Sequence, residues 1–246
     1  MLTIRNTPRT AGIEILGDHK DLLGLYLALH TVVGDDDEFH LEDARIRVLG
    51  VCYDLRHAMM GDRNIEFVDN GMDYDKIKRL GVVSSDKNVY YTVTVLWPEI
   101  LYVFLALNNF VQLYAKSRSK TSPTPILDAS NLWDSNIAQV RLFQSLVVAC
   151  LNEIVSEAAF RRIAKLMALP GTVLDATQYV DLLNMKFVNM DPDKRKKSLL
   201  TMVKRLVEQG PEYQQLRQKV EHVATKSHCE FSDIDFSWSY PEDINW

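Results

Sequence analysis

The sequence contains few cysteines and no spacing that would organise them. Its three cysteines are Cys52, Cys150 and Cys229, and no CxxC pair occurs. An odd number of widely separated cysteines argues against a disulfide framework and against a zinc-binding knuckle. We therefore expect a reduced protein in the cytoplasm, with no metal site and no cofactor.

Nucleotide-binding, hydrolase and metalloprotease motifs are missing as well. The chain has no GxGxxG, GxxxxGK[ST], GxSxG or HExxH, the patterns that supply a phosphate-binding loop, an activated serine or a zinc site. The most apolar run, 100–107, is far shorter than the roughly 20 residues of a transmembrane helix. The N-terminus also lacks the basic segment and long apolar run of a secretory signal. We expect a soluble protein without a membrane partner, and whether it is an enzyme stays open.

Positive charge is too scarce for a general affinity for nucleic acid. The chain has 28 Lys and Arg against 33 Asp and Glu, a formal net charge of −5, and phosphate binding needs clustered positive charge. With 47% hydrophobic residues among 246, the composition is that of a globular protein with one large domain or two modest ones.

Strand patterns are concentrated in residues 1–116. Two short apolar segments around a Thr-Pro-Arg-Thr turn, 2–5 and 12–16, predict a hairpin. Residues 64–71 predict another strand, and the alternating Val, Tyr and Thr of 88–97 predict a central one. An apolar helix is expected to follow, because Pro98 is tolerated in a first helical turn.

The second half of the chain has helical patterns. Residues 117–130 combine prolines with hydroxyl residues and predict a linker or exposed loop. Within a helical region over 131–228, the periodicity predicts one helix from 135 to about 168. The expected fold class is α+β: a small mixed or antiparallel sheet packed with helices, then a mainly helical half and a C-terminal strand. Whether the halves are separate domains stays open.

A helix predicted over 41–59 carries a polar stripe opposite its core face. Five residues of the stripe fall within about 40° of one line on a helix of 3.6 residues per turn: Asp43, Arg47, Gly50, Asp54 and His57. The spacings predict ion pairs from Asp43 to Arg47 and from Asp54 to His57. Gly50 removes a side chain from the middle of the stripe and permits close approach of a backbone or ligand.

Three interpretations of this stripe are open. The favoured one is an ion network between helices, since ion pairs at these spacings are common on helix surfaces. The second is a surface for a ligand or partner. The third is a catalytic site with Asp54 and His57 as an acid–base pair and Arg47 as the anchor of a small anionic substrate.

Four consecutive bases begin a helix predicted from 191 to 208. They are Lys194, Arg195, Lys196 and Lys197. Positive charge is unfavourable at a helix N-terminus, so these bases predict a surface for an anionic partner. A solvated helix face is the alternative.

The C-terminal segment 229–246 alternates apolar and polar residues. Its apolar positions, predicted to dock on the protein, are Ile234, Phe236, Trp238 and Tyr240. Alternation of this kind predicts a strand. We expect it to join the N-terminal sheet and cover an edge, with exchange onto another subunit or partner as the alternative.

Three segments resemble the N-terminal signature of an uncharacterised family of bacterial cytosolic proteins. They are GDHKDLLGLY, RVLGVCYDLRHAMMGDR and FVDNG, within about the first 115 residues. The resemblance implies a bacterial origin and transfers no catalytic residue. We expect a non-catalytic interaction or regulatory protein that forms a homo-oligomer or binds a protein partner. An enzyme for a small anionic substrate is the alternative, and nucleic-acid binding through 194–205 is a second one.

Overall fold

The computed structural model describes residues 1–35, 41–169, 171–236 and 238–246. The strands are β1 (Thr3–Asn6), β2 (Gly12–Gly17), β3 (Asn64–Asp69) and β4 (Lys87–Leu96). The helices of the first half are α1 (His19–Val33), α2 (Glu42–Met59), α3 (Tyr74–Leu80) and α4 (Trp97–Arg118). Those of the second half are α5 (Ala129–Leu132), α6 (Ser135–Ile154), α7 (Glu157–Met167), α8 (Gln178–Val188), α9 (Pro192–Glu208) and α10 (Pro211–Ser227). Short 3₁₀ turns lie at Pro125–Leu127 and Phe231–Asp233.

The strands form one antiparallel sheet in the order β1-β2-β4-β3. Ile15 pairs with Val93 and Ile13 with Val95, and all four side chains are buried. Strand β4 lies between β2 and β3, as its sequence predicts. The small antiparallel sheet and the helical second half confirm the α+β fold class.

Helix α4 connects the two halves of the chain. Pro98 lies in its first turn, and nearly every residue from Trp97 to Leu107 is buried. The helix contacts α1 and α2 from the first half and α6, α8 and α9 from the second. Buried residues of both halves belong to one hydrophobic cluster, so α4 is the shared core of the described chain.

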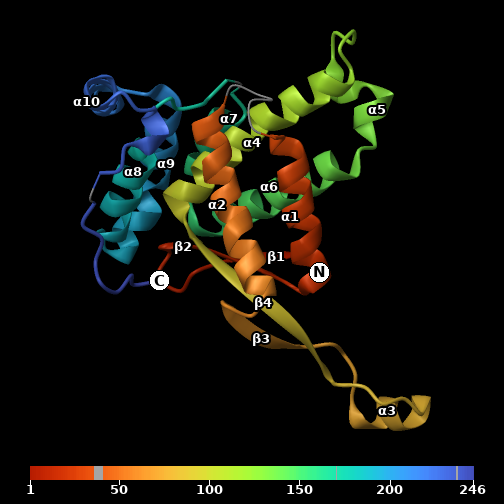
Figure 1. Ribbon diagram of the computed structural model, residues 1–246. Helices are drawn as coiled ribbons and strands as arrows, with labels where there is room; N and C mark the ends of the chain where they lie inside the picture. Colours follow the sequence, from red (N-terminus) through yellow and green to blue (C-terminus); the bar gives the residue numbers. More distant parts are fainter. Residues whose placement is uncertain (36–40, 170, 237) are drawn as a thin grey trace.

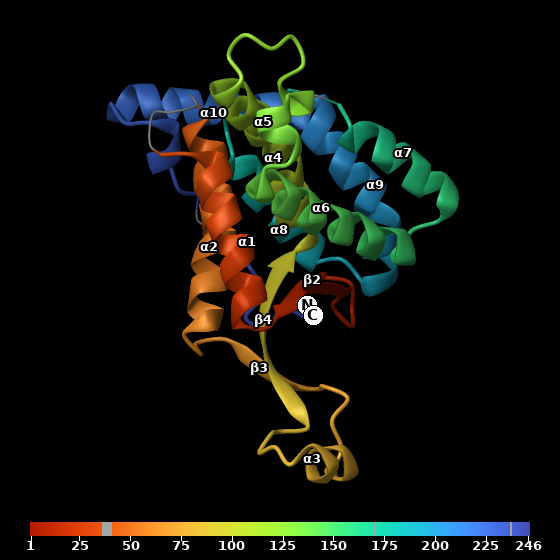
Figure 2. The ribbon, with the colours of Figure 1, turned by 90° about the vertical axis from the view of Figure 1, so that its right-hand side faces the viewer.

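A slender arm projects from this body. It consists of β3, α3 and the first half of β4, and it extends away from the remaining helices in Figures 1 and 2. The core face of the sheet continues onto the arm as Ile65, Phe67 and Val89. Helices cover Val93 and Val95 but not these three, which are 46%, 70% and 41% exposed. Strand β3 is also an edge strand, because β4 is its only neighbour in the described sheet.

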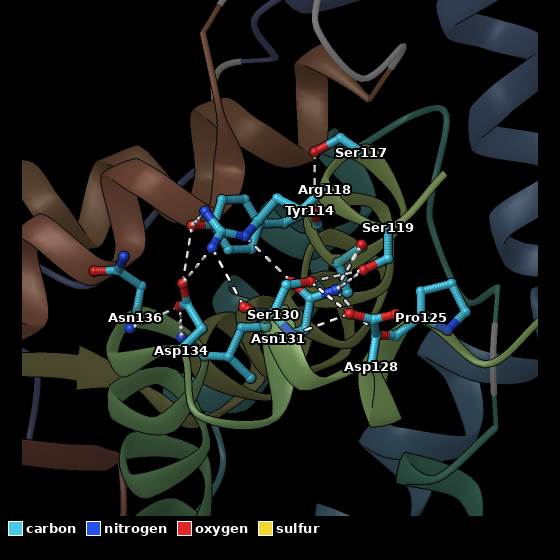
Figure 3. Close-up of polar contacts among 12 residues, drawn as sticks. Tyr114, Ser117, Arg118, Ser119, Pro125, Asp128, Ser130, Asn131, Asp134 and Asn136 are labelled. Carbon is cyan, nitrogen blue, oxygen red and sulfur yellow. Dashed lines mark hydrogen bonds and ion pairs between the residues drawn. The ribbon is translucent and has the colours of Figure 1, made fainter. Parts of the chain in front are cut away.

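Residues 117–130 fold back against the end of α4. The buried Asn131 donates to the carbonyl oxygens of Ala115 and Pro125, at 2.8 and 2.9 Å, and Arg118 donates to Asn131 Oδ1 (Figure 3). Arg118 also forms an ion pair with Asp134, the N-cap of α6. Most side chains of the loop are exposed, but both of its ends are fixed to the body.

The prediction of a single helix over 135–168 is wrong. Helix α6 ends at Ile154 and α7 begins at Glu157. The Ser156 hydroxyl accepts a hydrogen bond from the Ala159 N–H at 3.3 Å and therefore caps a new helix. Helix α8 is absent from the predicted elements, and its N-cap, Thr177, makes no side-chain cap hydrogen bond.

The predicted C-terminal strand is also wrong. The described residues of 229–246 form a 3₁₀ turn and irregular backbone, but no strand. The Gln178 amide of α8 donates to the carbonyl oxygens of Phe231 and Ile234, at 2.6 and 2.9 Å. A helix side chain thus occupies acceptors that a neighbouring strand would use, and the apolar positions pack on helices.

Helix α6 is long and apolar enough, by length and composition, to cross a membrane. Its Val140, Phe143, Val147 and Leu151 are buried in the body, and it carries Arg141. The core helix of a protein can pass the same test, so length and composition alone are weak evidence for a membrane span.

Candidate functional site

A groove of about 620 Å³ runs between α2, α8 and the C-terminal segment. Four of the five predicted stripe residues line it: Asp43, Arg47, Gly50 and Asp54. The opposite wall comes from Gln178 and Asp181 of α8 and from Asp235 of the tail. We call this site the α2 groove.

Both terminal nitrogens of Arg47 are occupied by partners within the protein. Its Nη1 donates to Asp181 Oδ1 at 2.7 Å and to Glu99 Oε2 at 3.3 Å, while its Nη2 donates to Asp181 Oδ2 and to the Thr177 carbonyl. Burial alone would lower the pKa of Arg47, but the hydrogen bonds and charges of the two carboxylates outweigh it and raise the pKa. A guanidinium bound in this way has little capacity left for a substrate anion. The anion anchor predicted at Arg47 is therefore already occupied.

Glu99 lies beneath the groove in the first turn of α4. Burial raises the pKa of this carboxyl, against the opposing effects of the Arg47 charge and of the Asn184 amide, which donates to Glu99 Oε2 at 2.8 Å. Arg47, Glu99 and Asp181 thus form an ion cluster that connects α2, α4 and α8.

Asp43 has no ion-pair partner among the described residues. Burial and the nearby charge of Glu42 raise the pKa of its carboxyl to about 6, although the charge of Arg47 opposes the rise. The same side chain lines a second opening of about 660 Å³, bounded by Asp175 and Glu230. Acidic surface therefore continues from the α2 groove toward the N-terminal end of α2.

Gly50 leaves open space in the groove wall. A Cβ added there would meet no atom within 4 Å. The absence of a side chain is therefore not required by tight packing of another helix, and the polar stripe stays accessible at its centre.

Neither predicted ion pair within α2 is formed. Asp54 accepts a hydrogen bond from Arg63 at 2.8 Å, and His57 Nδ1 lies 3.0 Å from Asp62 Oδ2. His57 does not line the α2 groove. Residues 62 and 63 belong to the turn after α2, so local sequence beyond the helix supplies the partners that the helical spacing predicted within it.

The four predicted bases of α9 do not form one surface. Arg195 is 2% exposed, and its guanidinium donates to the carbonyl oxygens of Phe187, Val188, Arg9 and Asn245. Arg195 thus fixes the end of α8, the β1–β2 loop and the C-terminus, which is a correction to its predicted role. Lys194, Lys196 and Lys197 remain exposed.

The predicted docking residues of the tail face the body. Ile234 is buried, Phe236 and Trp238 pack against the core, and the Tyr240 hydroxyl donates to the Asp181 carbonyl at 3.2 Å. The tail thereby closes one side of the α2 groove.

The groove also contains residues that local patterns do not reveal. Asp181 lies 134 positions from Arg47 and Glu99 lies 52 positions from it. Of these two acids, only Glu99 has a sequence signal, because it is the single carboxylate in the apolar first part of α4. Buried Gln178 Oε1, which has no hydrogen-bond partner, carries no sequence signal at all.

Cys52, the cysteine of α2, is not a reactive thiol, and the described residues contain no metal cluster. Burial raises the pKa of the Cys52 thiol to about 12, which keeps it protonated at neutral pH. Within the described ranges, no group of three or more His, Cys, Asp or Glu side chains could hold a metal ion.

Comparison with known proteins identifies a family to which no activity is assigned. Neither the curated proteins nor the solved structures contain a match to the chain. A family model described as a domain of unknown function, DUF6904, matches residues 2–246, well beyond the 115 residues of the sequence resemblance. The chain therefore belongs to the DUF6904 family of uncharacterised proteins.

Proposed function

We propose that the protein is a non-catalytic binding protein whose α2 groove holds a basic segment of a protein partner. The observation that carries the proposal is the charge of the groove lining. It contains five acidic residues (Asp43, Asp54, Glu99, Asp181 and Asp235) and one base, Arg47. Arg47 pairs with Glu99 and Asp181, and Arg63 pairs with Asp54, so Asp43 and Asp235 have no ion-pair partner among the described residues. Lys or Arg side chains of a partner would complement this charge.

The alternative of an enzyme for a small anionic substrate has weaker support. The proposed acid–base pair is separated, since Asp54 pairs with Arg63 and His57 with Asp62. An anionic substrate would meet the carboxylates of Asp43 and Asp235, which have no ion-pair partner among the described residues, and no free arginine. The hypothesis of nucleic-acid binding through 194–205 also has weaker support, because Arg195, one of its predicted bases, is buried.

A labelled octa-arginine peptide tests the groove by fluorescence anisotropy at low ionic strength. The double variant Asp43→Asn/Asp235→Asn removes two groove charges and should weaken binding about tenfold. Asp243→Asn, an exposed change in the same tail but outside the groove, is the control and should bind like the wild type. Absence of binding to octa-arginine, or equal affinities of double variant and control, would refute the proposal.

Self-association through the arm is a second candidate, favoured by the β3 edge. The core face of the sheet, exposed here on the arm, carries Arg63 just before β3 and then Ile65, Phe67 and Asp69 in order. In an antiparallel pair of two β3 strands centred on Glu66, Arg63 faces Asp69 of the second copy and Ile65 faces Phe67. A segment that complements itself in this way fits a two-fold symmetric interface.

Sedimentation equilibrium of the full chain tests this second candidate. Phe67→Lys places a charge at the centre of the interface and should convert a dimer into a monomer. Tyr74→Lys alters an equally exposed aromatic residue on α3, outside the strand pair, and should leave the dimer intact. A monomeric wild type, or dissociation by both variants alike, would exclude the β3 interface.

We also infer a bacterial cytoplasmic setting. The sequence resemblance supports the bacterial origin, and three free cysteines support a reducing compartment.

A further inference from the structure

A second cavity, of about 330 Å³, lies between α4, α6 and α7. Most of its walls are apolar, with Phe104 from α4, Leu151 from α6, and Phe160 and Ile163 from α7. Arg141 of α6 is the one charged residue among the described residues that line it. Apolar walls with a few placed polar groups are the usual form of a small-molecule site.

Arg141 has no acidic partner in the described chain. Its Nη1 donates to Asn108 Oδ1 at 2.6 Å and to Gln144 Oε1 at 2.8 Å. Both acceptors are neutral amides, and the Nε and Nη2 donors reach no acceptor among the described residues. No described carboxylate therefore balances the charge of the guanidinium, and the edge formed by Nε and Nη2 has no acceptor.

The two amides are themselves held in place. Asn108 Nδ2 donates to the Met167 carbonyl at 2.9 Å, and Gln144 Nε2 donates to the Phe104 carbonyl at 3.0 Å. These bonds point both amide oxygens at Arg141. The guanidinium is consequently oriented before any ligand arrives, which lowers the entropy cost of binding.

The charge of Arg141 is partly removed from water and is not paired with a carboxylate of the described chain. The side chain is half-buried, and burial lowers the pKa of its guanidinium with no nearby carboxylate to oppose the effect. A cation that is partly removed from water is stabilised by a paired anion. The Nε and Nη2 donors of an arginine match the two oxygens of a carboxylate.

We propose that this cavity binds a small carboxylate with an apolar tail. The carboxylate would accept hydrogen bonds from Nε and Nη2 of Arg141, and the tail would lie against Phe104 and Phe160. This site is separate from the α2 groove in lining residues and has the opposite charge preference.

Calorimetric titration of the full chain with three probes tests the ligand class. Octanoate carries both charge and tail, 1-octanol only the tail, and acetate only the charge. Octanoate should bind at least about tenfold more tightly than either of the others, the scale of a charge-assisted hydrogen-bonded pair.

Two variants test the location, because each blocks the site in a different way. Arg141→Gln removes the charge, and Ala164→Phe adds bulk to the cavity lining from α7 while keeping Arg141 in the chain. Each should weaken octanoate binding about tenfold or more while leaving the far-ultraviolet circular dichroism unchanged. Arg162→Gln removes an exposed charge of α7 outside the cavity lining and should bind octanoate like the wild type.

Three results would overturn the proposal. One is the absence of octanoate binding to the wild type, and another is equal binding of octanoate and octanol. The third is unchanged octanoate affinity in Ala164→Phe, which remains informative even if Arg141→Gln fails to fold.

Discussion

The Asp43 carboxylate lies where the α2 groove meets the second acidic opening, and its environment makes it sensitive to pH. Burial raises its pKa to about 6 in the folded protein, whereas an unfolded chain keeps a value of about 3.9. Folded protein therefore holds this proton more tightly than unfolded protein does. The contribution of Asp43 to stability declines as the pH rises from about 4 to about 6, and stays lost above that range.

Asp43→Asn should remove this loss. At a pH of about 7.5 we expect the variant to have a free energy of unfolding about 1 to 2 kcal/mol above that of the wild type, a range that allows for the partial exposure of the side chain. At a pH of about 4 the two proteins should be equally stable. Urea unfolding at both pH values measures the difference, and a gain that is the same at both would contradict the assigned cause.

Gly50 tests whether the open centre of the groove serves a partner. Gly50→Ala should raise the free energy of unfolding by about 0.5 to 1 kcal/mol, because alanine favours a helix and nothing lies within 4 Å of its Cβ. Gly24 of α1 is a matched control, since it also faces open space. Gly24→Ala should give the same stability gain in thermal unfolding, and only Gly50→Ala should weaken binding of octa-arginine.

At the element scale, one buried side chain connects segments that are far apart in the sequence. Arg195 of α9 donates to carbonyl oxygens at the end of α8, in the β1–β2 loop and near the C-terminus. The N-terminal hairpin and the C-terminus also meet directly, because the Arg9 N–H donates to the Trp246 carbonyl oxygen at 2.9 Å.

Arg195→Ala should destabilise the protein by about 2 to 4 kcal/mol, because it leaves several buried carbonyls without donors. Lys196→Ala, one residue further along the same helix and exposed, should change the free energy of unfolding by less than about 0.5 kcal/mol. Denaturant unfolding of the two variants provides the comparison. Similar values for both would mean that Arg195 contributes no more than its solvated neighbours.

Elements with a strong local signal could be predicted from the sequence. Pro98 followed by a continuous apolar stretch predicts α4, and the alternation of 88–97 predicts β4. The alternation of the tail is just as regular, but it reports only that one side is apolar. It does not report whether a strand or a helix covers that side, and in the structure α8 does.

The candidate site shows the same limit. Helical periodicity brings Asp43, Arg47, Gly50 and Asp54 to one face of α2. It cannot show that Arg47 meets Asp181 and Glu99, because those contacts depend on how α8 and α4 pack. Local spacing therefore located the surface, whereas its acidic character follows from tertiary structure.

At the scale of the whole molecule, the central position of α4 determines how the protein unfolds. Buried residues of α4 contact α1 and α2 from the first half and α6, α8 and α9 from the second, within one hydrophobic cluster. We expect a single cooperative transition, since neither half keeps a closed core when α4 leaves. Near-ultraviolet circular dichroism, which reports the buried Trp97 and Tyr102 of α4, should follow the same thermal curve as the far-ultraviolet signal of the helices. Two separated transitions would instead show that residues 1–116 and 131–228 fold as independent domains.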